Sequence, residues 1–213
     1  MFRHFLKKLA QVVMAIGFRY RVENPIPDVM GRALICANHA SNWDPIALLA
    51  AVPENAIFVA KKELEHVFVV GWILRKMQVI FVDRDHNDLT ALRKMLHVLQ
   101  DDCPLVLFPE GTRVHEPAPE KMKDGTGFFV QKAKTDVHCA YLDTTYRFRA
   151  PFTVRFRPAL KAEMLSTFDK RKGRHQITKL VYQMIYEPEC LVLESHSDAQ
   201  RGVDASVPEK ERE

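Results

Sequence analysis

The segment 38–44, Asn-His-Ala-Ser-Asn-Trp-Asp, places an imidazole at His39 and a carboxylate at Asp44. A carboxylate that accepts a hydrogen bond from Nδ1 of a histidine leaves Nε2 free to take a proton, so this pair can act as a general base. On one continuous helix the two side chains would lie about 140° apart. We expect Asp44 to cap a helix that begins at Pro45, and a loop that curls into this helix would bring the two side chains together. Taken alone, this spacing is more often that of an aspartate-capped turn beside a solvated histidine.

The segment 108–113, Phe-Pro-Glu-Gly-Thr-Arg, follows an apolar run and resembles an anion-binding loop. Ligands of α/β sheets bind beyond the carboxyl ends of the strands. Gly111 allows close approach of the backbone, Thr112 offers a hydroxyl and an N–H, and Arg113 can form forked hydrogen bonds to phosphate. Glu110 fits a bare phosphate site poorly, so we expect it to bond a substrate hydroxyl or an arginine. The alternative is a tight turn with a surface ion pair.

Two further basic residues are candidates for the same anion-binding site. Arg84 comes directly after the apolar run 79–82, and Lys123 ends the long loop 114–123. Either residue alone would be an ordinary solvated cation. A general base combined with a phosphate clamp predicts deprotonation of a hydroxyl on a phosphate-bearing substrate.

Short apolar runs alternate along the chain with segments of helical period. We expect strands at 33–37, 56–60, 79–82, 105–108, 137–145 and 152–156. We expect helices from Pro45, over 62–77, from Asn87 or Asp88 through Leu99, over 127–134 and around 177–185. This alternation predicts an α/β domain with a mainly parallel central sheet flanked by helices.

The N-terminal segment 1–22 contains basic residues and no acidic ones, and its apolar residues recur at helical spacing. Its longest apolar stretch, 9–18, is shorter than the about 20 residues that span a bilayer. The pattern is typical of an amphipathic helix in a membrane interface, and equally of a surface helix packed on the core. We expect a helix over 1–22, one domain over 23–194, and a polar, disordered tail over 195–213.

The composition adds few restrictions. A net charge of +4 is too small to indicate a particular binding partner. The fractions of hydrophobic residues, 47%, and of charged residues, 27%, are ordinary for a globular protein. The cysteines are widely spaced without a CxxC pair, which indicates small buried side chains in a reducing compartment rather than disulfides or a zinc site. They are Cys36, Cys103, Cys139 and Cys190.

These segments resemble the lysophosphatidate (1-acylglycerol-3-phosphate) acyltransferase family of the phospholipid/glycerol acyltransferase superfamily. Members carry an NHxxxxD block and an FPEGTR block, and both are intact here at 38–44 and 108–113. An intermediate block ending in arginine matches 79–84, and a Lys-x-Gly matches 123–125. A fourth block, usually a proline entering an apolar strand, is altered at 137–142, which bears on acceptor or acyl-chain preference.

The resemblance implies transfer of an acyl group from acyl-CoA or acyl-carrier protein to the free sn-2 hydroxyl of 1-acyl-glycerol-3-phosphate. The product would be phosphatidic acid, a phospholipid precursor, formed without an acyl-enzyme, a metal or a further cofactor. His39 would be the base and Asp44 would orient it, while Arg84, Glu110, Gly111 and Arg113 would hold the acceptor. A lipid acceptor favours the membrane-interface interpretation of segment 1–22 and a position on the cytoplasmic face of the membrane.

Three alternatives remain open at this point. The acceptor could be another lysophospholipid, a lyso-ornithine lipid or glycerol-3-phosphate, and a non-catalytic lipid-binding protein is a different class of function. A metal-dependent phosphohydrolase would need a second His/Asp cluster, which the sequence lacks. The basic run 170–174 has no nucleic-acid motif beside it, so we expect a solvated or lipid-facing surface and no nucleic-acid partner.

Overall fold

A seven-stranded sheet forms the centre of the molecule, with the strand order β1-β7-β6-β2-β5-β3-β4. Every pairing is parallel except β6 with β7, which is antiparallel. The strands are β1 Arg19–Glu23, β2 Ala33–Ala37, β3 Ile57–Lys61, β4 Ile80–Val82, β5 Pro104–Leu107, β6 Asp136–Thr144 and β7 Pro151–Phe156. The computed structural model describes residues 1–187 apart from 85, 87, 123–124 and 170–172. The predicted α/β fold with a mainly parallel sheet is confirmed.

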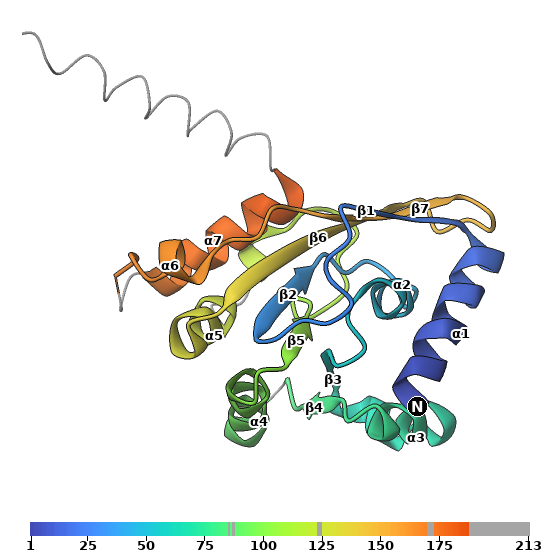
Figure 1. The fold of residues 1–213 in the computed structure, drawn as a ribbon, viewed down its shortest axis with the longest axis horizontal. Coiled ribbons are helices and arrows are strands. Elements are labelled where there is room, and N and C mark those ends of the chain that lie inside the picture. Colours follow the sequence, from blue (N-terminus) through green and yellow to red (C-terminus); the bar gives the residue numbers. More distant parts are fainter. Residues whose placement is uncertain (85, 87, 123–124, 170–172, 188–213) are drawn as a thin grey trace, which may run out of the picture.

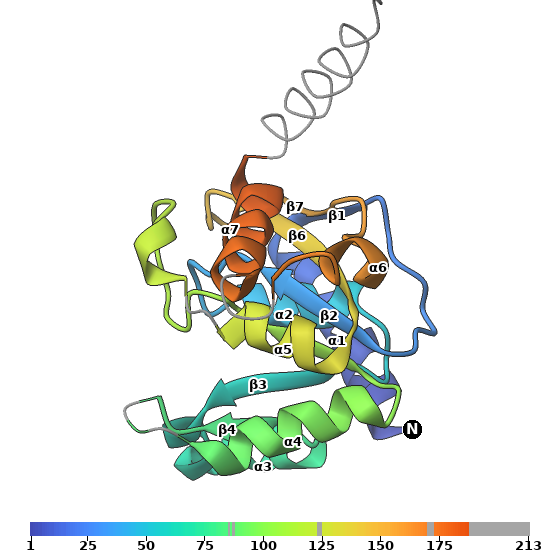
Figure 2. The same cartoon turned by 90° about the vertical axis from the view of Figure 1, so that its left-hand side faces the viewer.

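Helices cover both faces of this sheet (Figure 1; Figure 2). They are α1 Phe2–Gly17, α2 Asp44–Ala51, α3 Phe68–Lys76, α4 Leu89–Gln100, α5 Gly125–Ala133, α6 Ala162–Leu165 and α7 Gly173–Tyr186, with 3-10 turns η1 Lys62–His66 and η2 Pro119–Lys121. One core cluster joins α1, α2 and α3 to Ile35 of β2, and the other joins α4, α5 and α7 to Leu34 and Cys36. Because side chains alternate along a strand, the fully buried β2 supplies both layers.

The N-terminal helix is shorter than the predicted 1–22. α1 ends at Gly17, and Arg19–Glu23 forms β1 in parallel pairing with β7. Phe18 is extended, and the Arg19 N–H donates to Ala150 O at 2.8 Å, which turns the chain from helix into sheet. Tyr20, predicted on the helix, lies on β1. Neither β1 nor α6 was predicted.

The predicted helix over 62–77 is also wrong in part, because η1 and α3 are separate. Val67 between them is extended, and the Gly71 N–H donates to its carbonyl at 2.6 Å. A Cβ at Gly71 would lie 2.1 Å from Glu65 O, so η1 crosses closely over α3 there. Val67, Val69 and Val70 are β-branched, and such residues favour helices less.

Other expectations have mixed outcomes. Asp88 caps α4, since its Oδ1 accepts the Ala91 N–H at 2.9 Å. Cys36 and Cys139 are buried free thiols and Cys103 is partly buried. Cys190, Asn87 and the tail 195–213 lie outside the described residues, so the expectations for them stay predictions.

The contact between α5 and α7 generates a stability prediction. A Cβ at Gly127 would meet Arg174 O of α7 at 2.1 Å, whereas one at Gly125 would meet nothing within 4 Å. We expect Gly127→Ala to lower the free energy of unfolding by about 1–3 kcal/mol, because backbone must move. Gly125→Ala, in the same helix, should leave it unchanged or raise it by up to about 1 kcal/mol. Denaturant unfolding of both variants measures this, and equal midpoints would contradict it.

Candidate active site

His39 and Asp44 lie together in the loop that leads from β2 into α2. His39 Nδ1 is 3.1 Å from Asp44 Oδ2, and the Asp44 side chain is fully buried. The same oxygen accepts the backbone N–H groups of Ala40 and Ser41, each at 2.7 Å. The pairing predicted from the sequence is therefore present. A carboxylate in this position favours the His39 tautomer with hydrogen on Nδ1.

The predicted capping role of Asp44 needs correction. Asp44 is itself the first residue of α2, and no side chain caps this helix. The backbone N–H groups that bind its carboxylate come from Ala40 and Ser41, in the loop before the helix. The loop curls back over the carboxylate, and this curl brings His39 within reach.

The second carboxylate oxygen of Asp44 has a distant partner. The Tyr146 hydroxyl, from the loop between β6 and β7, donates to Asp44 Oδ1 at 2.8 Å. Burial and the Asp44 charge both raise the Tyr146 pKa, so the hydroxyl stays protonated and remains a donor.

The ring of His39 is held by the second sequence block. It stacks on Phe108, with ring centroids 4.2 Å apart and an interplanar angle of 21°. The Val114 N–H donates to His39 O at 2.7 Å, which ties the two blocks together by backbone as well. The side chain is 13% exposed, so a substrate can reach it only over a small part of the ring. Among the described residues none hydrogen-bonds Nε2, the atom that a base would use.

The 108–113 segment forms a tight turn beside the histidine. The Gly111 N–H donates to Phe108 O at 3.0 Å, and Gly111 has a φ of 66°, in the left-handed region that favours glycine. Gly111 therefore shapes the turn, and its N–H is already engaged within it. Thr112 and Arg113 follow as exposed residues. They are the exposed polar residues of this block, whereas Glu110 is buried.

The two predicted arginines both join the turn to neighbouring segments. Arg84 donates from Nη1 to Gly111 O, and Arg113 donates from Nη1 to Asn42 Oδ1 at 3.1 Å. Burial lowers the pKa of the half-buried Arg84, yet a guanidinium stays charged in proteins. The structure thus gathers Arg84, Gly111, Arg113 and the His39 loop at the carboxyl ends of β2, β4 and β5. Lys123 lies outside the described residues, so its role stays a prediction.

Glu110 has a different partner from those expected. Its side chain is buried, and the Tyr186 hydroxyl at the end of α7 donates to Oε1. Burial raises the pKa of Glu110 to about 7, while the hydrogen bond from Tyr186 opposes that rise. With 2% of the residue exposed, Glu110 lies beneath the turn rather than on the surface that a substrate would meet. The contact attaches α7 to the site from below.

Three residues that build the site had no role assigned from the sequence: Asn38, although it opens the first block, Tyr146 and Tyr186. The Asn38 amide donates to Leu142 O at 3.1 Å and accepts the Leu142 N–H at 2.7 Å, which continues the β2–β6 pairing. Tyr146 lies 102 positions from Asp44, and Tyr186 lies 76 from Glu110. A tyrosine after a strand or at a helix end has no pattern that would indicate a buried carboxylate partner.

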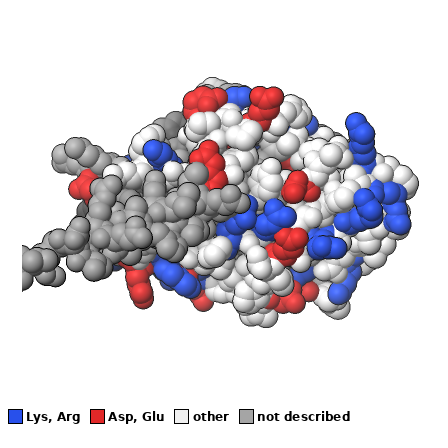
Figure 3. Space-filling model, turned by 90° about the horizontal axis from the view of Figure 1, so that it is seen from above, with Lys and Arg blue, Asp and Glu red and all other residues white. Residues whose placement is uncertain are grey.

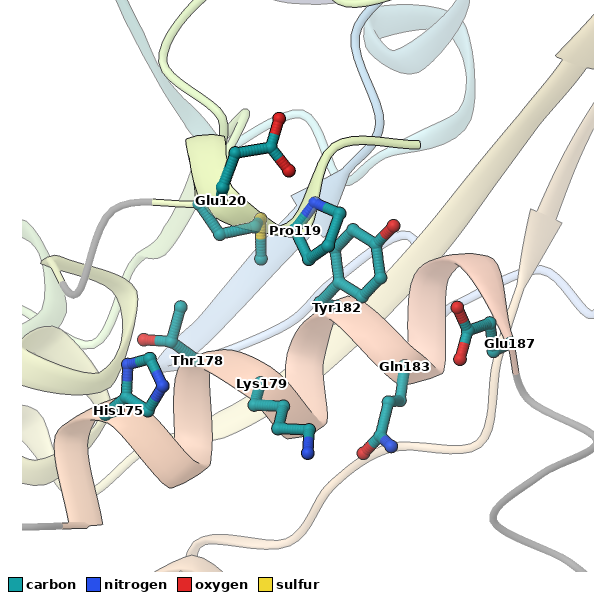
Figure 4. Close-up of a pocket in the computed structure, with 9 residues that line it drawn as sticks. Pro119, Glu120, His175, Thr178, Lys179, Tyr182, Gln183 and Glu187 are labelled. Carbon is teal, nitrogen blue, oxygen red and sulfur yellow. The ribbon is translucent and has the colours of Figure 1, made fainter. Parts of the chain in front are cut away.

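A cavity of about 380 Å³ lies elsewhere, between η2 and α7 (Figure 4). Tyr182 and Pro119 face each other across it, and Lys179 and Gln183 follow along the helix. None of the predicted site residues that the structure describes lines it. Tyr182, which lines the cavity, packs on Tyr186 with ring centroids 4.8 Å apart, and Tyr186 in turn bonds Glu110. These two tyrosines therefore lie between the cavity and Glu110. In the described ranges, no three His, Cys, Asp or Glu side chains group closely enough to hold a metal.

Comparison with known proteins places the chain in a family. Residues 18–143 match the sequence model of the Acyltransferase family, and this range is more than half of the chain. The chain belongs to the acyltransferase family, which confirms the resemblance drawn from the two blocks.

Two curated relatives illustrate the likeness. The 1-acyl-sn-glycerol-3-phosphate acyltransferase of Streptococcus pneumoniae is 30% identical over 120 residues, covering 55% of this chain and 44% of that protein. The Helicobacter pylori protein of the same name is 39% identical over 85 residues, covering 39% of this chain and 36% of its own. This chain therefore aligns with less than half of the length of either relative.

The fold is similar to the crystal structure of the 1-acyl-sn-glycerophosphate (LPA) acyltransferase, PlsC, from Thermotoga maritima. The TM-score is 0.68 at 19% sequence identity, covering 97% of this chain and 81% of that chain. At this identity the likeness establishes the fold.

The raised pKa of Glu110 predicts how stability depends on pH. Between its ordinary value of 4.5 and about 7, the carboxyl is protonated when folded and ionised when unfolded. The unfolded chain then binds fewer protons, so stability falls as pH rises through this window. The free energy of unfolding of the wild type should therefore decrease between about pH 5 and pH 8. In Glu110→Gln we expect this decrease to be smaller by about 1–3 kcal/mol.

Thermal or denaturant unfolding across this pH range is the measurement, with Glu120→Gln as the matched control. Glu120 is exposed, so its variant should follow the wild-type curve. If the Glu110→Gln curve also runs parallel to the wild type, the pKa of Glu110 is not raised.

Proposed function

We propose that this protein is a 1-acylglycerol-3-phosphate O-acyltransferase that uses His39 as a general base. The observation that carries the proposal is the His39–Asp44 pair stacked on Phe108 of the block that also presents Arg113. A base and a cation pair on touching loops suit a substrate that has both a hydroxyl and a phosphate. The names of the relatives in the same family support the choice of acceptor.

The proposed reaction is a direct transfer. His39 Nε2 takes the proton of the acceptor's sn-2 hydroxyl while that oxygen attacks the thioester carbonyl of the donor. The C–O bond forms, the C–S bond breaks, and the leaving thiolate of CoA or acyl-carrier protein receives the proton. Asp44 stabilises the imidazolium that exists between these steps, because its buried carboxylate already accepts from Nδ1.

Acceptor binding is assigned to the arginines of the site. Arg84 and Arg113 supply positive charge next to the Gly111 turn, and the exposed Thr112 adds a hydroxyl. Gly111 contributes through the shape of the turn, since its N–H is engaged with Phe108. Glu110 supports the turn from beneath. This arrangement favours an acceptor with a phosphate, which includes glycerol-3-phosphate and other phosphate-bearing lysolipids as alternatives.

The surface beside α1 supports a membrane partner for this reaction. On α1, Phe5, Val12 and Ile16 are 60%, 55% and 61% exposed, while Leu6, Ala10 and Met14 pack on the core. α1 thus has a second apolar side that the protein leaves uncovered.

Two other segments extend this exposed apolar side. Phe68 and Trp72 of α3 are 91% and 51% exposed, and Trp72 packs edge-to-face on Phe2 of α1 at 5.9 Å. Phe148, 79% exposed, belongs to the β6–β7 loop, whose Arg149 N–H donates to Gly17 O at 2.7 Å. We name these α1, α3 and Phe148 side chains the apolar face; α1 and α3 lie along one side of the molecule in Figure 1.

The charges around the apolar face fit an anionic lipid surface. α1 and α3 contain basic residues and no acidic ones. Figure 3 shows Lys and Arg side chains gathered at the end of the molecule where α1 meets the β6–β7 loop. Among the described helices, none has the length and apolar character to cross a bilayer. We propose that the protein lies on the cytoplasmic face of the membrane with the apolar face in the interface.

The activity test offers acyl-CoA and acyl-carrier protein with lysophosphatidate, glycerol-3-phosphate and other lysolipids. We expect transfer to lysophosphatidate, and His39→Ala should reduce kcat by about 10²–10⁴-fold because the base is lost. His97→Ala, an exposed histidine on α4, is the matched control and should retain full activity. Transfer that survives in His39→Ala would exclude His39 as base, and transfer to a different acceptor alone would reassign the substrate.

The membrane test is sedimentation with vesicles that contain anionic lipid. Phe5→Ser and Phe68→Ser remove exposed rings, so we expect each to weaken binding by about tenfold or more without loss of melting temperature. Met164→Ser is the control, since Met164 is 43% exposed on α6, far from α1 in Figure 1. If Phe5→Ser and Phe68→Ser bind the vesicles as strongly as the wild type and Met164→Ser do, the apolar face is not the membrane contact.

A further inference from the structure

The buried Asp44 carboxylate accepts four hydrogen bonds, and their origins differ. Three reach Oδ2 from the adjacent loop: His39 Nδ1 and the N–H groups of Ala40 and Ser41. The fourth reaches Oδ1 from Tyr146, 102 positions along the chain. Among the described residues, Tyr146 alone links the Asp44 carboxylate to the β6–β7 loop, through its side-chain hydroxyl.

Tyr146 is held rigidly for this contact. Its φ is 54°, in the left-handed region that non-glycine residues rarely adopt, and its N–H donates to Thr144 Oγ1 at 3.2 Å. Its ring packs edge-to-face on the fully buried Phe152 at 6.0 Å between centroids. Backbone in this region persists when the surroundings determine it, and such residues cluster at functional sites.

We propose that Tyr146 is a positioning residue for the catalytic pair, which sets the orientation and effective charge of Asp44 toward His39. This inference rests on the proposed role of His39 as base. The Oδ1 bond prevents the carboxylate from turning away from His39. It also draws part of the negative charge away from Oδ2, because a donated hydrogen bond stabilises the ionised carboxylate.

Removing only the hydroxyl isolates this role. In Tyr146→Phe the ring can keep its packing on Phe152, while buried Oδ1 loses its donor. The carboxylate then interacts more strongly with a neighbouring positive charge, so it should stabilise the imidazolium form of His39 more than in the wild type. Among the described residues, the charged and titratable groups placed against His39 are Asp44 and the buried Glu110, which are bonded to Tyr146 and Tyr186 respectively.

The structure offers a matched control in Tyr20→Phe. Tyr20 also packs against Phe152, at 6.3 Å, and its hydroxyl donates to Ala47 O of α2 at 2.7 Å without touching Asp44. Both variants remove one hydrogen-bonded hydroxyl from a partly buried tyrosine that packs on Phe152. If Tyr146 had a purely structural role, the two variants should have the same acyl-transfer activity and the same His39 titration.

The experiment measures acyl transfer and the NMR titration of the His39 ring in wild type, Tyr146→Phe and Tyr20→Phe, with His39→Gln to assign the signal. For Tyr146→Phe we expect kcat about tenfold lower at similar KM, and the acidic limb of the pH–rate profile moved to higher pH. The His39 resonance should titrate at correspondingly higher pH. Tyr20→Phe should match the wild type in all three readouts.

The outcomes separate the two proposals. A wild type without transfer activity, whose His39 titration still moves in Tyr146→Phe alone, would overturn the proposed function and keep the link between Tyr146 and the pair. Active variants that share the same kcat, pH profile and His39 titration would overturn the positioning role and keep the proposed function.

Discussion

The site is organised around a carboxylate that is removed from water. Asp44 is fully buried, and an ionised carboxylate in such a place is tolerated only when hydrogen-bond donors replace its hydration. Its four donors come from two distant parts of the chain. Meeting this requirement curls the 38–43 loop, fixes the start of α2 and draws the β6–β7 loop inward. The orientation of His39 follows from the same set of bonds.

A second acidic side chain is buried beneath the 108–113 turn. Glu110 is covered by the turn that it belongs to and is bonded by Tyr186 from α7. Each carboxylate therefore has a tyrosine donor supplied by a segment late in the chain. The difference lies in the other partners, because Asp44 faces the imidazole whereas Glu110 fastens α7 under the 108–113 turn. The upper carboxylate serves the proposed chemistry and the lower one supports the loop.

The parts predicted from the sequence are those with local signals. Apolar runs indicated buried strands such as β2, and the spacing of His39 and Asp44 indicated a loop that pairs them. β1 was missed because Arg-Tyr-Arg-Val-Glu lacks an apolar run and continues the helical spacing of α1. The break between η1 and α3 depends on a tertiary contact at Gly71, and the roles of Tyr146 and Tyr186 depend on long-range pairing. Local patterns contain no information on either.

The apolar face is assembled from three separate segments of the chain, so membrane binding and folding stability are coupled. α1 could be amphipathic in isolation, but Trp72 meets Phe2 and Phe148 lies near Gly17 only through the tertiary fold. A bilayer that contacts all three segments is therefore a ligand of the native state, and its binding free energy adds to folding stability. On the proposed membrane location, the chain would be least resistant to unfolding and proteolysis when detached, so the membrane would set its lifetime as well as supply the proposed acceptor.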